Sequence, residues 1–252
     1  MDRSGRRSPG QMRRQVWLKW RLSDSEDVRA LAAAQLAAGS GQQDDTPPQR
    51  GDDDRTVDPL LAGLAALADG DFTTATTVLS DAAGSGRQPE CLTALSDVCA
   101  SRGDWRQAAD LAGRAAVLRP DDPVAIVAAA ATLSERDSSA ALKLLWPLHI
   151  ERPGDPVVSY YAVHVLLRRG VTVSSTSRDG RAVIISASQL AECRWVVTEL
   201  NSLGGGDQEA AAEAGALAEQ VRIAEHLTWR RQGANKGTLA LFVGLSLVLL
   251  AI

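Results

Sequence analysis

Residues 89–122 have the sequence PECLTALSDVCASRGDWRQAADLAGRAAVLRPDD. Asp104 lies in the middle of this stretch and suits the N-cap of a helix, with Gln107 three residues later at capping-box spacing. Gly103 directly precedes this cap, and Gln88-Pro89 marks the start of an earlier helix. The stretch therefore predicts two consecutive helices.

The same features recur along the chain at a period of about 33 residues. Asp-Pro pairs stand at 58–59, 122–123 and 155–156, and each suits an N-cap followed by proline in the first helical turn. Three further sets keep an offset of 33 residues: Asp71, Asp104 and Asp137; Ala75, Ala108 and Ala141; Pro120 and Pro153. A period of this length with two helices per unit predicts a helical solenoid, because one hairpin alone buries too little surface.

The repeats resemble the tetratricopeptide repeat (TPR) family over about residues 57–169. That family has characteristic positions for apolar, turn, aromatic and small residues and for a terminal proline. In this chain they hold Leu92, Leu95, Cys99, Gly103, Trp105, Ala108, Ala115 and Pro120. The sequence departs from the family pattern at three positions: Ser96 in place of a small glycine, Ala112 in place of a larger residue, and Ser138 in place of an aromatic ring.

The resemblance implies a concave groove that binds a protein partner. Its phase assigns seven residues to that groove: Glu90, Thr93, Asp97, Ile126, Ala130, Ser159 and Val163. The Lys, Arg and Asn residues with which some repeats of this family hold a carboxylate are absent from these positions. We therefore expect an apolar or basic peptide, or a neighbouring helix, in the groove; alternatively, the linker or the final helix fills it.

The N-terminal region, residues 1–38, comprises a basic segment and a short helix. Trp17 and Trp20 share one helical face beside Arg and Lys, a pattern typical of an interfacial helix on anionic lipid; a disordered basic tail is the alternative. Ser23 and Glu26 form a capping-box start for a helix to about Ala38. Residues 39–57 are rich in Asp, Pro and Gly and are expected to be a disordered acidic linker.

Residues 170–203 break the repeat pattern. The first helix of the fourth unit, which completes the repeats at 58–169, is expected to stop at Gly170. Two strands over 171–176 and 181–186 then form a β-hairpin, and a helix runs to about Leu203. A further helix is expected over 207–232.

Residues 237–252 carry no charge and are expected to form a single C-terminal transmembrane helix. Sixteen residues span about 24 Å against a hydrocarbon core of about 30 Å, so the segment is a short span, part of a longer one, or a buried core helix. The expected membrane-interface residues are Trp17, Trp20, Trp229, Arg230, Arg231 and Lys236. The basic flank at 230–236 predicts that the N-terminal bulk lies in the cytoplasm and that the protein sits in the inner membrane of a bacterial cell.

Composition and motifs exclude several function classes. The net charge of −4 argues against nucleic-acid binding, and aromatic residues make up only 4% of the chain, which favours closely packed helices over large β folds. The three Cys and three His match no metal spacing, and no catalytic or phosphate-binding motif is present, so we expect neither an enzyme nor a cofactor. The expected function is a membrane-anchored protein-interaction scaffold or adaptor; the alternative is a structural or assembly subunit of a larger membrane complex.

Overall fold

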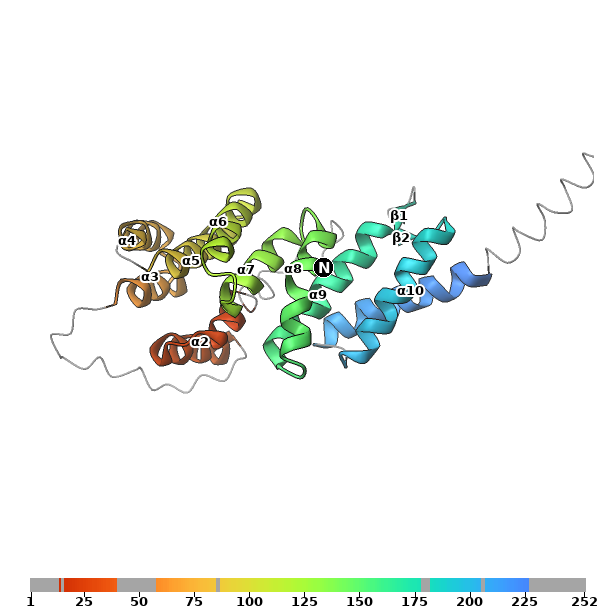
Figure 1. The fold of residues 1–252 in the computed structure, drawn as a ribbon, viewed down its shortest axis with the longest axis horizontal. Helices are drawn as coiled ribbons and strands as arrows, with labels where there is room; N and C mark the ends of the chain where they lie inside the picture. The colour runs from red at the N-terminus through yellow and green to blue at the C-terminus, as the bar shows by residue number, and fades with distance from the viewer. Residues whose placement is uncertain are drawn as a thin grey trace, which may run out of the picture. The chain divides into compact units, whose positions relative to one another are not determined.

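The computed structural model describes residues 14, 16–39, 58–84, 87–177, 182–204 and 207–226 (Figure 1). The chain divides into two compact units, residues 1–165 and 166–252. The described residues are mostly helical, and in the first unit the consecutive helices between residues 26 and 151 pack against one another. The mostly helical, solenoid-like fold expected from the sequence is therefore confirmed for this part of the chain.

The first unit contains three consecutive helical hairpins among its described residues. Their helices are α3 (Pro59–Ala68) with α4 (Phe72–Ala83), α5 (Gln88–Ser101) with α6 (Trp105–Leu118), and α7 (Pro123–Leu133) with α8 (Ser138–Glu151). The first helices of adjacent hairpins also touch, because α3 contacts α5 and α5 contacts α7. Neighbouring hairpins thus share a core, as the 33-residue period predicts.

The recurring aspartates cap these helices. Side chains of one series accept a hydrogen bond from the backbone N–H three residues later, at 2.9–3.1 Å: Asp71, Asp104 and Asp137. Aspartates of the Asp-Pro pairs accept from the N–H two residues later, at 2.8–3.1 Å: Asp58, Asp122 and Asp155. Each cap satisfies a backbone donor that the helix itself leaves unpaired, so the helix starts follow directly from the sequence.

Small residues let the helices of a hairpin approach closely. Ala75, Ala108 and Ala141 are all fully buried, as expected for the repeated alanine position. Ser96 donates from its hydroxyl to the carbonyl of Ala108 at 2.9 Å. This bond between α5 and α6 explains how a serine is accommodated at the contact, because its polar group is satisfied at close range.

Gly63 of α3 leaves room for the side chain of Leu79 of α4. A Cβ at this position would lie 2.4 Å from Cγ of the buried Leu79. We expect Gly63→Ala to lower the free energy of unfolding by about 1–3 kcal/mol through overpacking. Gly113→Ala is the matched control, because open space surrounds Gly113 within α6 and alanine there should stabilise by about 0.5–1 kcal/mol. Urea unfolding followed by circular dichroism measures both, and equal effects would contradict the assigned contact.

The N-terminal region adds residues 16–19, which are helical, the 3₁₀ turn η1 (Trp20–Leu22) and the helix α2 (Glu26–Gly39). The helix start predicted at Ser23 is two residues early, because α2 begins at Glu26. The Ser23 hydroxyl accepts a hydrogen bond from the backbone N–H of Ser25 at 3.2 Å, and the N–H of Ser23 donates to the carbonyl of Trp20 at 3.2 Å. The linker predicted after α2, from residue 40 on, lies outside the described residues.

The predicted helix stop at Gly170 is also wrong, because α9 (Pro156–Val173) continues through it. A Cβ on Gly170 would lie 2.6 Å from Cδ2 of Leu217, so this glycine provides room for the helix over 208–226. The hairpin is present but short, with β1 (Ser175–Thr176) antiparallel to β2 (Ala182–Val183).

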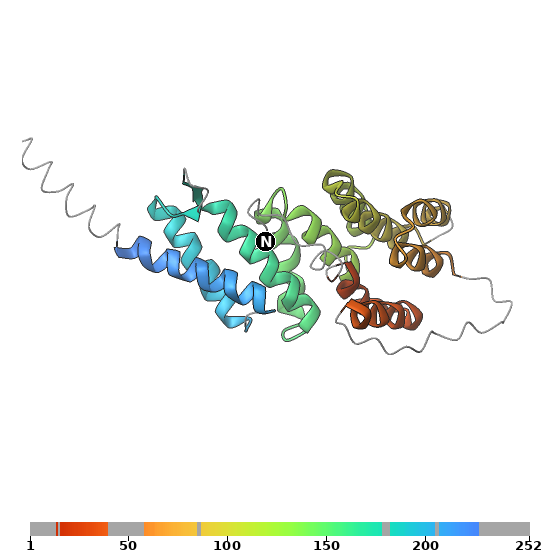
Figure 2. The same cartoon turned by 180° about the vertical axis from the view of Figure 1, so that it is seen from behind.

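The second unit continues with α10 (Ala187–Ser202), which Ser186 caps by accepting from the N–H of Gln189 at 3.2 Å. This helix lies beside the helix over 208–226 in both views (Figures 1 and 2), and Arg194 and Glu225 form an ion pair between them at 2.7 Å. Across the described residues no helix is both long and apolar enough to cross a membrane. The transmembrane segment predicted at 237–252 lies outside that part of the chain, as do Trp229, Arg230, Arg231 and Lys236.

Candidate partner-binding groove

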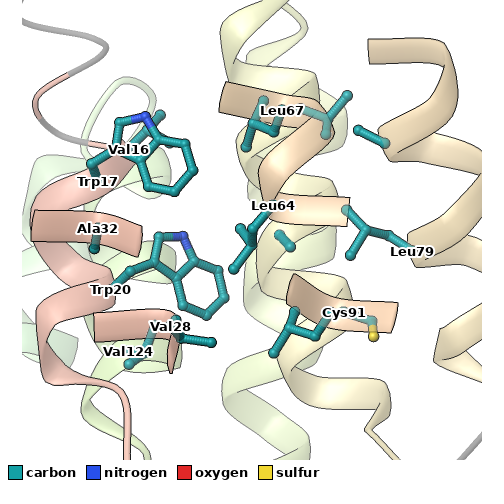
Figure 3. Close-up of a cluster of buried hydrophobic side chains, with 14 of the residues drawn as sticks. Val16, Trp17, Trp20, Val28, Ala32, Leu64, Leu67, Leu79, Cys91 and Val124 are labelled. Atoms are coloured by element: carbon teal, nitrogen blue, oxygen red, sulfur yellow. The ribbon is translucent and has the colours of Figure 1, made fainter. Parts of the chain in front are cut away.

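The first helices of the three hairpins share a face that another part of the chain covers. We call this face of α3, α5 and α7 the groove, and residues 16–39 the N-terminal segment. The two sides form one buried apolar cluster, which joins residues of the segment to residues of the helices: Val16, Trp17, Trp20, Val28 and Ala32 with Leu60, Leu64, Leu67, Ala94, Val98 and Val124. Figure 3 shows the rings of Trp17 and Trp20 directed from the segment toward α3.

Asp97 of α5 is the polar centre of the groove, and its side chain is almost fully buried. Lys19 donates from Nζ to Asp97 Oδ1, and Trp20 donates from Nε1 to Asp97 Oδ2 at 2.9 Å. Lys19 also donates to the carbonyl of Val16 at 3.1 Å. Each carboxylate oxygen therefore has its own donor from the N-terminal segment.

The ion pair between Asp97 and Lys19 is buried, and this burial affects the pKa of Asp97. Asp97 and Lys19 are each only 3% exposed. Burial raises the pKa of the Asp97 carboxyl, while the ammonium of Lys19 and the hydrogen bond from Trp20 act in the opposite direction. Because both charges have left water, each depends on the other, and removing one leaves an uncompensated buried charge.

A small cavity lies beside the ion pair. Its volume is about 30 Å³, and its lining includes Ser101, Trp105, Thr132 and Tyr161 together with the ion pair itself. This space is on the scale of one water molecule. Nearby, the guanidinium of Arg14 lies over the Tyr160 ring of α9, 5.3 Å from its centroid. The N-terminal chain thus extends from α3 as far as α9.

The seven residues predicted to line the groove have different environments. Asp97 is the one for which a bond to the N-terminal segment is found among the described residues. Four others are buried in the repeats: Thr93, Ile126, Ala130 and Val163. Glu90 and Ser159 are partly exposed, and Glu90 pairs with Arg119 at 2.7 Å. Within the described part of the first unit, the N-terminal segment covers the groove.

Trp17 and Trp20 require a correction. Both were expected on a lipid-facing surface, but they are 3% and 1% exposed and belong to the protein core. The shared helical face was predicted correctly; the apolar surface that it contacts is protein. Sequence reasoning missed Lys19 as the partner of Asp97, because 78 residues separate them and no local pattern links the two.

The three cysteines are free thiols in hydrophobic surroundings. Cys91 and Cys193 are buried, and Cys99 is half-buried. Burial raises the pKa of Cys91 to about 11, and it also raises the pKa values of Cys99 and Cys193. Thiolates are the reactive form, so these groups lack the character of nucleophiles. Within the described part of the chain, no cluster of side chains has the composition of a metal site.

We expect Cys91 and Cys193 to resist alkylation in the native chain at pH 8, since they are both buried and protonated. Iodoacetamide labelling followed by peptide mass spectrometry checks this, with the urea-unfolded chain as the control in which all three cysteines react. Rapid native labelling of Cys91 would contradict the buried position of this residue on α5.

Comparisons of the chain with protein-family models, curated proteins and solved structures find no match. The class of protein is therefore defined by the fold and the groove: a helical-repeat protein whose first helices are covered by a segment distant in sequence.

Proposed function

We propose that the protein is a membrane-anchored scaffold in which TPR-like repeats hold a protein partner through the groove. One observation carries the proposal: α3, α5 and α7 already accommodate a short segment from elsewhere in the chain, through buried indole rings and one charged anchor. Short helices seated in apolar grooves, with tryptophan as a main energetic contact, are a recurring mode of protein recognition. The proposal assigns the protein no chemical reaction of its own.

The membrane part of the proposal rests on the sequence. Residues 237–252 are uncharged, and Arg230, Arg231 and Lys236 stand shortly before them. This distribution favours a single pass with the repeats on the cytoplasmic face of the cell membrane. Lipid contacts are assigned to the C-terminal segment and to its flank at 229–236.

A second candidate function has one observation in its favour. Gly237, Gly244 and Ser246 are small residues within or beside the apolar tail. Small residues let transmembrane helices pack closely, so the tail also suits a subunit of a larger membrane complex. A stable multiprotein species in mild detergent would favour the subunit, and a lone chain would favour the scaffold.

Membrane attachment is tested by cell fractionation. We expect the full chain to stay with membranes after carbonate and high-salt washes, and a chain ending at Gln232 to be soluble. If both chains are soluble, membrane anchoring is refuted.

Partner binding is tested by photocrosslinking in cells. A photoreactive residue replaces Ser101, which is exposed and lines the cavity beside the groove, or Arg106, which is exposed on α6. We expect a protein partner to crosslink from position 101 and not from position 106. No crosslink at 101, or the same products from both positions, would contradict a groove-bound partner.

A further inference from the structure

The polar anchor of the N-terminal segment is short. Within residues 16–22, Trp17 and Trp20 lie three positions apart on one face and are buried against the repeats. Lys19 and Trp20 supply the two donors to Asp97. The helix α2 adds apolar contacts through Val28 and Ala32, while its opposite side is exposed at Ala33, Ala34 and Ala38. Both polar donors to Asp97 and both buried indole rings therefore come from the sequence Trp-Leu-Lys-Trp over 17–20.

The groove is chemically complementary to this pattern. Leu64, Val98 and Val124 supply apolar surface, and a single buried carboxylate, Asp97, lies within reach of it. Such a surface selects a segment that buries indole rings while also presenting an ammonium and an indole N–H to one carboxylate. A segment that lacks the cation would leave Asp97 desolvated without a partner, which is strongly unfavourable.

The segment is also separable from the repeats in the chain. Residues 40–57 connect it to α3, and their composition of Asp, Pro and Gly with one large apolar residue, Val57, provides little to bury. Four helices of the repeats, α3, α4, α6 and α7, are capped by their own aspartates and not by the segment. Departure of the segment therefore breaks side-chain contacts and leaves the repeat backbone intact.

From these observations we propose that the groove recognises a short partner helix with a Trp-x-Lys-Trp pattern, and that residues 16–22 occupy the site until such a helix displaces them. This inference rests on the proposed scaffold function and specifies its ligand. The resident segment has a high effective concentration because it belongs to the same chain as the groove. A competing helix consequently binds the wild-type chain more weakly than it binds an unoccupied groove.

The test uses a fluorescent peptide with the sequence of residues 12–24 of this chain and the full chain in mild detergent. The variant Trp17→Ala/Trp20→Ala weakens the resident segment and opens the groove. We expect it to bind the peptide at least tenfold more tightly than the wild-type chain does, as measured by fluorescence polarisation. Adding Asp97→Asn to this variant should reduce the affinity at least tenfold, and a peptide with Lys19→Ala and Trp20→Ala should not bind.

A second measurement avoids mutations in the core. A protease site inserted between residues 40 and 57 of the full chain allows the segment to be cut from the repeats after folding. We expect excess peptide 12–24 to release the cut fragment, as seen by size-exclusion chromatography. A fragment that stays bound in millimolar peptide, or an open and folded variant that does not bind the peptide, overturns the inference.

The remaining outcomes separate the two proposals. If position 101 crosslinks a partner but peptide 12–24 fails to bind, the ligand inference is overturned and the scaffold proposal stands. If the peptide exchanges but no partner crosslinks, the scaffold proposal falls and only the chemistry of the groove is supported. If the segment exchanges between two copies in a stable dimer, the occupant is a second copy, and the inference of a separate partner is overturned.

Discussion

Asp97→Ala is expected to weaken the hold of the N-terminal segment on the groove by about 3–5 kcal/mol. The substitution removes the acceptor for both Lys19 and Trp20 while their side chains remain buried against α5. A buried ammonium without a carboxylate costs far more than the net stability of the pair, so the segment should open to return Lys19 to water. Amide hydrogen exchange over residues 16–39, read by mass spectrometry, reports this opening.

A double substitution serves as the control for this effect. Lys19→Met/Asp97→Leu removes both charges together and should recover most of the lost protection, because a buried ion pair replaced by apolar groups is often neutral. Trp20 still loses its acceptor in this variant, at a cost of about 1–3 kcal/mol, so recovery should be incomplete. If the double variant exchanges as fast as Asp97→Ala alone, the buried charge is not the cause.

Trp20→Ala is the second large effect, with an expected loss of about 3–5 kcal/mol. The side chain is 1% exposed, is the largest fully buried group in the described residues, and connects the segment to the cluster on α3, α5 and α7. Its removal leaves a cavity and also removes one of the donors to Asp97. The measurement is the same hydrogen exchange, combined with urea unfolding by circular dichroism.

Two further variants isolate the contributions of the Trp20 ring. Trp20→Phe keeps most of the apolar volume and loses the N–H, so its effect should lie between those of the wild type and Trp20→Ala. Trp195→Ala is the matched tryptophan control, because Trp195 is 39% exposed on α10 and its loss should be much smaller. Equal losses for Trp20→Ala and Trp195→Ala would contradict the buried position of Trp20.

Local signals in the sequence predicted the helical hairpins well. Asp71, Asp104 and Asp137 mark helix starts because a carboxylate caps the backbone within three residues of itself. A cap joins residues only two or three positions apart, so it can be predicted from the local sequence alone. The 33-residue offset then predicted that the hairpins stack, since each repeats the same apolar face.

The failures lie where a contact joins distant parts of the chain. Gly170 has the character of a helix stop in isolation, yet it is interior to α9 because Leu217, 47 residues later, requires the space. The β-hairpin consequently starts later and is shorter than predicted. Of the seven groove residues derived from the repeat phase, Asp97 proved to bind another segment, and its partner Lys19 had no local signal.

The sequence by itself determined where the capped helices of the repeats begin, how often the hairpin repeats, and that Trp17 and Trp20 share one face. Only the tertiary structure decided what that face meets. An amphipathic helix has the same pattern whether its apolar side enters lipid or packs on protein, because burial of apolar surface is non-directional. In this protein the apolar side packs on protein. The stacking of α3, α5 and α7 places the buried carboxylate of Asp97 next to Lys19, 78 residues away in sequence, and this contact holds the segment on the repeats.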